Sequence, residues 1–154
     1  MDKQDRQILE LLQQDASLPV NELAEQVGLS STACWRRIQK LEEQGVIRRR
    51  VALLDGAKLN VGVTVFVAVR TSRHDTRWLD QFHAAVATIP EVVELYRMAG
   101  ETDYLMRVVV PDVAAYDRVY KRLIRMAELA DVSSSFAMEQ IKYTTALPLE
   151  YVGV

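Results

Sequence analysis

The side chains best able to do chemistry in this chain form a polar, cationic set between residues 31 and 50. At about 100° per residue, the outer face of a helix would be shared by Thr32, Arg36, Gln39, Lys40 and Glu43. Donors and long cations on such a face can reach base edges and phosphates in a DNA major groove. The alternative for a single amphipathic helix is a solvated face with ordinary surface charge. We expect DNA contacts from the following residues: Ser31, Thr32, Trp35, Arg36, Arg37, Gln39, Lys40, Arg48, Arg49 and Arg50.

The charge is unevenly distributed along the sequence. The whole chain of 154 residues has a formal net charge of -2. Residues 1–30 hold six acidic and two basic side chains, whereas residues 31–50 hold six basic and two acidic ones. A short basic segment in an acidic protein favours specific, salt-sensitive phosphate contact, because a uniformly basic chain would bind DNA everywhere. The three consecutive arginines can also contact phosphates while they connect to the next domain.

Three short helices are predicted to position these side chains. The first begins at Asp2 and ends before Ser17, and the second is about two turns long and stops at Gly28, where a left-handed residue ends a helix. The third begins at the good N-cap residues Ser30 and Ser31 and closes at Gly45. A short helix, a glycine turn and a capped basic helix together predict a helix-turn-helix.

The second half of the chain alternates strand and helix patterns. The predicted elements are a strand at 61–70, a helix at 75–89, strands at 92–98 and 104–110, a helix opening at Pro111 and Asp112, and a long last strand at 131–145. This order predicts a ferredoxin-like βαββαβ sandwich. The expected fold class is therefore α+β, with an N-terminal winged-type helix-turn-helix at 1–50, a linker at 51–60 and the sandwich at 61–154.

Apolar residues occupy both faces of the predicted sheet. Alternate valines from Val61 to Val69 fill one face of the first strand, while Phe66 and Ala68 lie on the other. Two helices cover only one face of such a sheet, so the second apolar face predicts a second subunit. A helix-turn-helix that reads paired half-sites of double-stranded DNA also needs a two-fold partner.

Several classes of protein are excluded by composition. The longest apolar run, around Val61 to Val69, is too short to span a bilayer, and the N-terminus lacks a signal pattern, so we expect a cytoplasmic protein without membrane contact. The single Cys34 excludes an intrachain disulfide and is expected to be a buried apolar side chain. Two histidines far from it form no ligand cluster, so no metal site is expected.

Several stretches of the sequence match a known family. They are Asp5-Arg6-Gln7-Ile8-Leu9, Leu23-Ala24-Glu25-Gln26-Val27-Gly28-Leu29-Ser30, Cys34-Trp35-Arg36-Arg37-Ile38-Gln39-Lys40-Leu41-Glu42, Gly45-Val46-Ile47, and Gly100-x-x-Asp103-Tyr104-Leu105. Through them the chain resembles, over essentially its whole length, the Lrp/AsnC feast-or-famine transcription regulators. Residues 133–145 look like the branch that contains the cysteine-responsive regulator of cysteine detoxification.

The resemblance implies a dimer joined through the sensing domains, assembly to a ring-like octamer, and an amino-acid effector, cysteine or another, at subunit interfaces. After Gly100 the chain can present backbone N–H groups to an α-carboxylate, and Asp103 can pair with the α-ammonium. Alternatively, Gly100 only permits a hairpin turn and Asp103 caps it. The expected effector-binding residues are Met98, Gly100, Glu101, Thr102, Asp103, Tyr104, Ser133, Ser134 and Ser135.

Two other functions remain open at this point. Sirohaem decarboxylases resemble the same two-domain fold, but they would need residues that hold a tetrapyrrole, and His74 and His83 are expected at the surface. A non-specific architectural DNA binder would differ in its ratio of specific to random-sequence affinity. We expect a sequence-specific DNA-binding transcription regulator with an amino-acid effector, and no catalytic residues, metal or other cofactor.

Overall fold

The computed structural model describes residues 1–126 and 129–153 of the chain. The chain divides into two compact units. The helical unit combines Met1–Leu53 with Ile141–Val154, and the sheet unit comprises Leu54–Gln140. The predicted division into 1–50, 51–60 and 61–154 therefore needs a correction, because the C-terminal segment groups with the helices rather than with the sheet.

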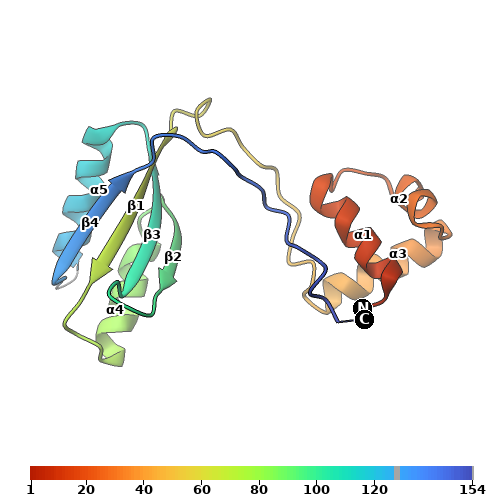
Figure 1. Ribbon diagram of the computed structural model, residues 1–154, viewed down its shortest axis with the longest axis horizontal. Helices are drawn as coiled ribbons and strands as arrows, with labels where there is room; N and C mark the ends of the chain where they lie inside the picture. The colour runs from red at the N-terminus through yellow and green to blue at the C-terminus, as the bar shows by residue number, and fades with distance from the viewer. Residues whose placement is uncertain (127–128, 154) are drawn as a thin grey trace. The chain divides into compact units, whose positions relative to one another are not determined.

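The helical unit contains the three predicted helices, α1 (Lys3–Gln14), α2 (Val20–Val27) and α3 (Ser31–Glu43) (Figure 1). Helix α1 begins with a capping box, in which Asp2 and Asp5 each accept a hydrogen bond from the other's backbone N–H. Gly28 ends α2 with φ +69°, and the Ser30 hydroxyl accepts a hydrogen bond from the Ala33 N–H at the start of α3. The local signals for these helix ends are confirmed.

The inner faces of the three helices form one apolar core. Its buried members are Ile8, Leu9, Leu23, Ala24, Val27, Cys34, Ile38 and Leu41. Cys34 is fully buried, and burial raises the pKa of its thiol. The expectation that this cysteine packs as a small apolar side chain is confirmed.

The C-terminal segment packs on the helical unit. The Gln13 amide donates to the Leu147 carbonyl at 3.2 Å and accepts from the Leu147 N–H at 2.5 Å. The Arg6 guanidinium donates to the Val152 carbonyl at 2.9 Å, and the Leu149 side chain packs against the apolar core. We call residues 147–152 the C-terminal strap. The strap is held on α1 by hydrogen bonds between its backbone and the side chains of Arg6 and Gln13, and by the packing of Leu149.

The predicted last strand, 131–145, is wrong beyond Phe136, because β4 spans only Asp131–Phe136. Its neighbour β1 (Val63–Arg70) runs antiparallel to it, and Val65 lies opposite Phe136. One more hydrogen bond follows, from the Ala137 N–H to the Thr64 carbonyl. Beyond it the pairing has passed the start of β1 at Val63, so the chain has no strand to pair with there.

The sheet unit has the predicted βαββαβ order. After β1 come α4 (Thr76–Ala87), β2 (Val92–Arg97), β3 (Tyr104–Val110), α5 (Val113–Met126) and β4. The strands lie in the order β2-β3-β1-β4, and every neighbouring pair is antiparallel. This is the ferredoxin-like arrangement expected from the sequence.

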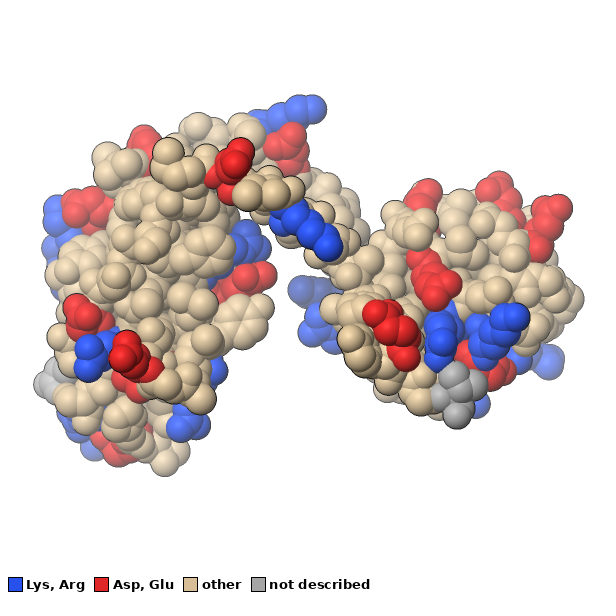
Figure 2. All heavy atoms as spheres, in the orientation of Figure 1, with Lys and Arg blue, Asp and Glu red and all other residues tan. Residues whose placement is uncertain are grey.

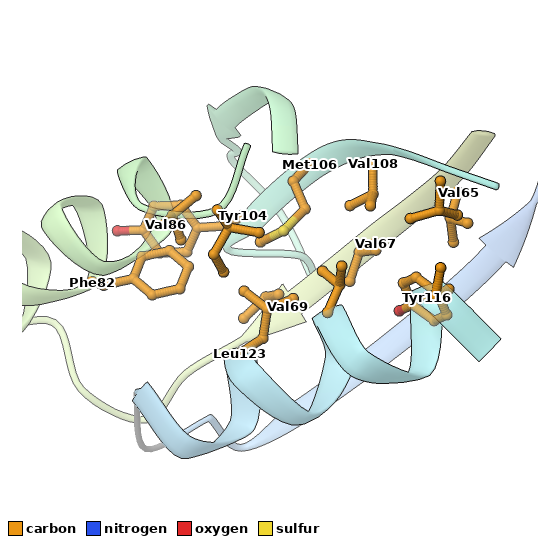
Figure 3. Packing of buried hydrophobic residues seen from close by; sticks show 14 of the residues in the cluster. Val65, Val67, Val69, Phe82, Val86, Tyr104, Met106, Val108, Tyr116 and Leu123 are labelled. Atoms are coloured by element: carbon orange, nitrogen blue, oxygen red, sulfur yellow. The ribbon is translucent and has the colours of Figure 1, made fainter. Parts of the chain in front are cut away.

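One face of the sheet packs against both helices (Figure 3). Val65, Val67 and Val69 are fully buried on this face, and Phe82 of α4 and Leu123 of α5 pack over it. The opposite face also carries apolar side chains, as predicted: Phe66 is 41% exposed, and Leu105 and Val109 are partly exposed, with the Arg107–Glu94 ion pair among them. Within the described part of the chain no helix is long and apolar enough to cross a membrane.

Candidate nucleic-acid interface and sensing loop

The outer face of α3 carries the predicted polar set. Thr32, Arg36 and Lys40 are exposed, opposite the buried Cys34 and Ile38. Among residues 1–126 and 129–153, no hydrogen bond or ion pair engages these three side chains, and Ser31 is likewise exposed at the first turn. Their donors are therefore free to contact a ligand that lies along the helix.

A groove of about 540 Å³ runs between α3 and the segment that follows it. Trp35, 52% exposed, lines one wall. Ile47 is partly buried against the helical core, and its N–H donates to the Leu41 carbonyl, which holds the following arginines beside the helix. The groove residues are Val20, Trp35, Ile38, Gln39, Glu42, Ile47, Arg48, Arg49 and Arg50. An indole beside three guanidinium groups suits a sugar-phosphate backbone.

Glu42 joins two of the predicted contacts, and the sequence analysis missed it. Its Oε1 accepts a hydrogen bond from Arg50 Nη2 at 2.9 Å, and its Oε2 accepts one from Gln39 Nε2 at 3.2 Å. The spacing of three residues could have indicated the hydrogen bond between Gln39 and Glu42, since side chains at that spacing are neighbours on a helix.

Arg37 is engaged differently from the rest of the set. Its Nη1 lies 2.7 Å from Asp2 Oδ2 and 2.8 Å from Asp5 Oδ1, and its Nη2 donates to the Gln4 side chain. Hydrogen bonds to Asp5 and Asp2 raise the pKa of Arg37. The Asp5 backbone N–H, followed by Arg37, lowers the pKa of Asp2. Arg37 thus ties α3 to the start of α1, and its predicted DNA contact stays a prediction.

The charge of the helical unit is uneven along its sequence. In Figure 2 acidic side chains lie along the upper edge of this unit, and basic side chains lie lower down, with further acidic ones among them. Residues 1–30 are predominantly acidic and residues 31–50 are predominantly basic. A DNA duplex would therefore be attracted to the part of the unit that carries α3 and the arginines.

The loop between β2 and β3 is held to the end of β1 through Asp103. Gly100 has φ +112°, which favours glycine, and the Met98 N–H donates to the Asp103 carbonyl at 2.8 Å. Asp103 Oδ2 accepts a hydrogen bond from the Thr71 N–H at 2.8 Å. Asp103 Oδ1 accepts none from the described residues. The carboxylate therefore ties this loop to the residue that follows β1, while its pairing with an ammonium group stays a prediction.

The loop leaves several predicted effector residues accessible, but not all of them. Met98, Gly100 and Glu101 are exposed and Thr102 is partly exposed. Tyr104 is only 3% exposed, because its ring packs among the following aromatic side chains of α4: Trp78, Phe82 and His83.

The three serines of β4 do not form one cluster with this loop. The Ser134 hydroxyl forms a hydrogen bond with the Tyr116 hydroxyl of α5, on the helix side of the sheet. Ser133 and Ser135 are exposed on the other face, opposite Ala68 and Phe66 of β1. Because β1 separates β4 from β3, these serines lie about 10 Å from the strand that follows the loop.

A helix-turn-helix with a free cationic outer face, joined to a ferredoxin-like unit with an exposed glycine loop, defines a DNA-binding regulator with a separate sensing domain. The family model described as Lrp/AsnC ligand binding domain matches residues 64–147, and the model described as winged helix-turn-helix DNA-binding matches residues 1–48. The chain belongs to the Lrp/AsnC family of transcription regulators.

Individual relatives match this chain over nearly its whole length. The DNA-binding transcriptional activator DecR of Escherichia coli is 52% identical over 97% of this chain and 99% of its own. The crystal structure of an AsnC family transcriptional regulator from Agrobacterium tumefaciens is 64% identical, with a TM-score of 0.96 and 99% of each chain covered. A transcriptional regulator from Neisseria meningitidis, solved with L-Met, is 37% identical, with a TM-score of 0.92 and 97% of each chain covered. Named regulators over this extent favour a regulator over the decarboxylase alternative.

Proposed function

We propose that this regulator reads paired operator half-sites as a homodimer and changes its DNA binding when it takes up a small amino acid. The observation that carries the proposal is the outer face of α3, where Thr32, Arg36 and Lys40 have no partner among the described residues. Side chains that a helix holds without partners inside the protein can form hydrogen bonds to DNA, because no existing hydrogen bond has to be broken first.

The proposed interface has two sets of residues, which differ in the part of the DNA that they would contact. Thr32, Arg36 and Lys40 point away from the helical core and would contact base edges, with Ser31 at the first turn. Trp35 and the Arg48-Arg49-Arg50 segment line the adjacent groove and would contact the backbone of one strand. Base contacts supply specificity and phosphate contacts supply affinity, so the two sets should respond differently to substitution.

The homodimer is proposed to form through the uncovered face of the sheet. Phe66 is 41% exposed and Tyr96 54% exposed on strands whose other face is packed against helices. An apolar sheet face of this kind needs a cover, and a second copy related by a two-fold axis would bury the same residues on both sides. Assembly of such dimers into the octamer that the resemblance implies is part of the same proposal.

The effector is proposed to be a small amino acid that binds beside the Gly100 loop at a subunit interface. Support comes from the ligand-binding domain model over residues 64–147 and from the relative solved with L-Met. The exposed backbone around Gly100 can donate to a carboxylate, and Asp103 supplies a carboxylate at the end of the loop for the ammonium group. Cysteine is the first candidate, because residues 133–145 resemble the cysteine-responsive branch.

The proposal is tested on the DNA upstream of the regulator's own gene. Arg36→Ala should lower operator affinity by roughly five- to 150-fold per subunit, since a well-placed contact contributes about 1–3 kcal/mol. Lys3→Ala is the matched control: it removes one exposed positive charge on α1, outside α3 and outside the groove lining. A thermal-shift screen of the standard amino acids tests the sensor. Operator affinity unchanged by Arg36→Ala would refute the assignment of α3.

A further inference from the structure

Glu42 is the one carboxylate that lines the proposed DNA groove. Its two oxygens are bound to two different predicted DNA contacts, Arg50 at 2.9 Å and Gln39 at 3.2 Å. The hydrogen bond from Gln39 fixes the orientation of the carboxylate, which leaves Oε1 directed at the guanidinium. Arg50 therefore already has an anionic partner in the protein without DNA.

A carboxylate and a phosphate make the same kind of contact with a guanidinium group. Both offer paired anionic oxygens to its planar N–H donors. The Glu42 and Arg50 side chains are 35% and 45% exposed, so a phosphate could exchange with the carboxylate without unfolding the helix. Exposed pairs of this type are weak, which also favours exchange.

The neighbouring arginines show that this pairing is particular to Arg50. Arg48 and Arg49 are exposed and form no ion pair within the described ranges. Arg37 has two aspartate partners at the start of α1 and lies away from the groove lining. Among the three arginines of the groove, Arg50 alone must break a contact in order to bind phosphate.

We propose that Glu42 is an internal competitor of DNA phosphate, which holds Arg50 in the free protein and lowers sequence-independent affinity for DNA. The proposal rests on the proposed function and deepens it by naming a residue that opposes binding. This competition keeps the regulator from being held on random sequence.

The test measures binding of the full-length protein to a random-sequence duplex. Glu42→Gln keeps the shape of the side chain and removes its charge. We expect affinity to rise roughly three- to ten-fold at moderate salt, and the dependence of log K on log salt concentration to steepen by up to about 0.9 per subunit. Glu43→Gln is the matched control, because Glu43 is the adjacent exposed acid and has no partner in the described chain.

A second pair of variants tests whether Glu42 acts through Arg50. In an Arg50→Ala background, Glu42→Gln should give no rise beyond that of Glu43→Gln, because the competitor has nothing left to hold. Equal effects of Glu42→Gln and Glu43→Gln, or an undiminished rise without Arg50, would overturn the proposal. Thermal melts check folding, and Glu42→Ala replaces Glu42→Gln if the latter melts early. Wild-type protein that binds no duplex at all would instead refute the proposed function itself.

Discussion

Replacing Leu149 with alanine should loosen the helical unit and leave the sheet unit intact. Leu149 is partly buried against the core formed by α1, α2 and α3, although it lies more than a hundred residues later in the sequence. Complete burial of a leucine contributes about 1.5–3 kcal/mol, so a partly buried one should contribute about 1–2 kcal/mol to the free energy of unfolding of this unit.

Leu147 provides a matched control in the same strap. Its side chain is 71% exposed, and it contacts Gln13 only through its backbone N–H and carbonyl. Leu147→Ala removes a leucine of the same size but keeps both hydrogen bonds, so the free energy of unfolding should change by no more than about 0.5 kcal/mol. Deleting residues 141–154 removes the leucine and the hydrogen bonds together, and it should cost roughly 2–4 kcal/mol.

Hydrogen exchange measured peptide by peptide is the suitable assay, because it reports each unit separately. For Leu149→Ala, protection of the α1 amides should fall about five- to 30-fold, since about 1.4 kcal/mol corresponds to a factor of ten. Protection of β1 and β3 amides should stay at the wild-type level. Equal protection in Leu149→Ala and Leu147→Ala would refute the packing of the strap on α1.

Three further predictions concern charge. Changing Arg48, Arg49 and Arg50 together to alanine should weaken binding to every DNA sequence and flatten the salt dependence, whereas an unchanged slope would show that these arginines do not contact phosphate. Asp103→Asn should keep the loop in place, because an amide oxygen can still accept the hydrogen bond from the Thr71 N–H, but it should abolish the effector response in a ligand titration; normal binding would leave Asp103 only the role of holding the loop to Thr71. The pKa of Asp2 is lowered in the folded state, so its stabilising contribution is present above the ordinary pKa of aspartate and is lost as the pH falls through the lower, folded value. Asp2→Asn should therefore reduce the loss of stability on acidification in a pH series of denaturant melts, and an unchanged acid transition would contradict this.

Local signals in the sequence were sufficient to predict most of the fold. The glycine at position 28 and the serine at position 30 mark helix ends through their own conformation and hydrogen bonding, so the sequence located α2 and α3 closely. Alternation of valines in β1 likewise identified the face that packs on the helices, because a strand exposes successive side chains on opposite faces. Such features depend on neighbours within a few residues.

The features that sequence analysis missed depend on distant partners. The strap has no periodic apolar pattern, and its place is fixed by Gln13, more than a hundred positions earlier. A helical wheel places Arg37 on the flank of α3, but it cannot reveal that two aspartates of α1 lie there. The motif assigns Tyr104 to the effector site, which stays a prediction, but it does not reveal that the aromatic side chains of α4 pack around the ring and leave it 3% exposed.

The grouping of residues 1–53 with residues 141–154 has a consequence for synthesis on the ribosome. The three helices emerge early, yet the leucine and the backbone groups that complete their unit leave the ribosome only after the whole sheet unit has been made. The nascent helices therefore lack the contacts of the strap and are less stable while the sensing domain folds. A regulator assembled in this order reaches full stability of its DNA-binding helices only when the sensing domain is already present. Chimaeras that exchange sensing domains would need two junctions, near residues 53 and 140, to preserve that order.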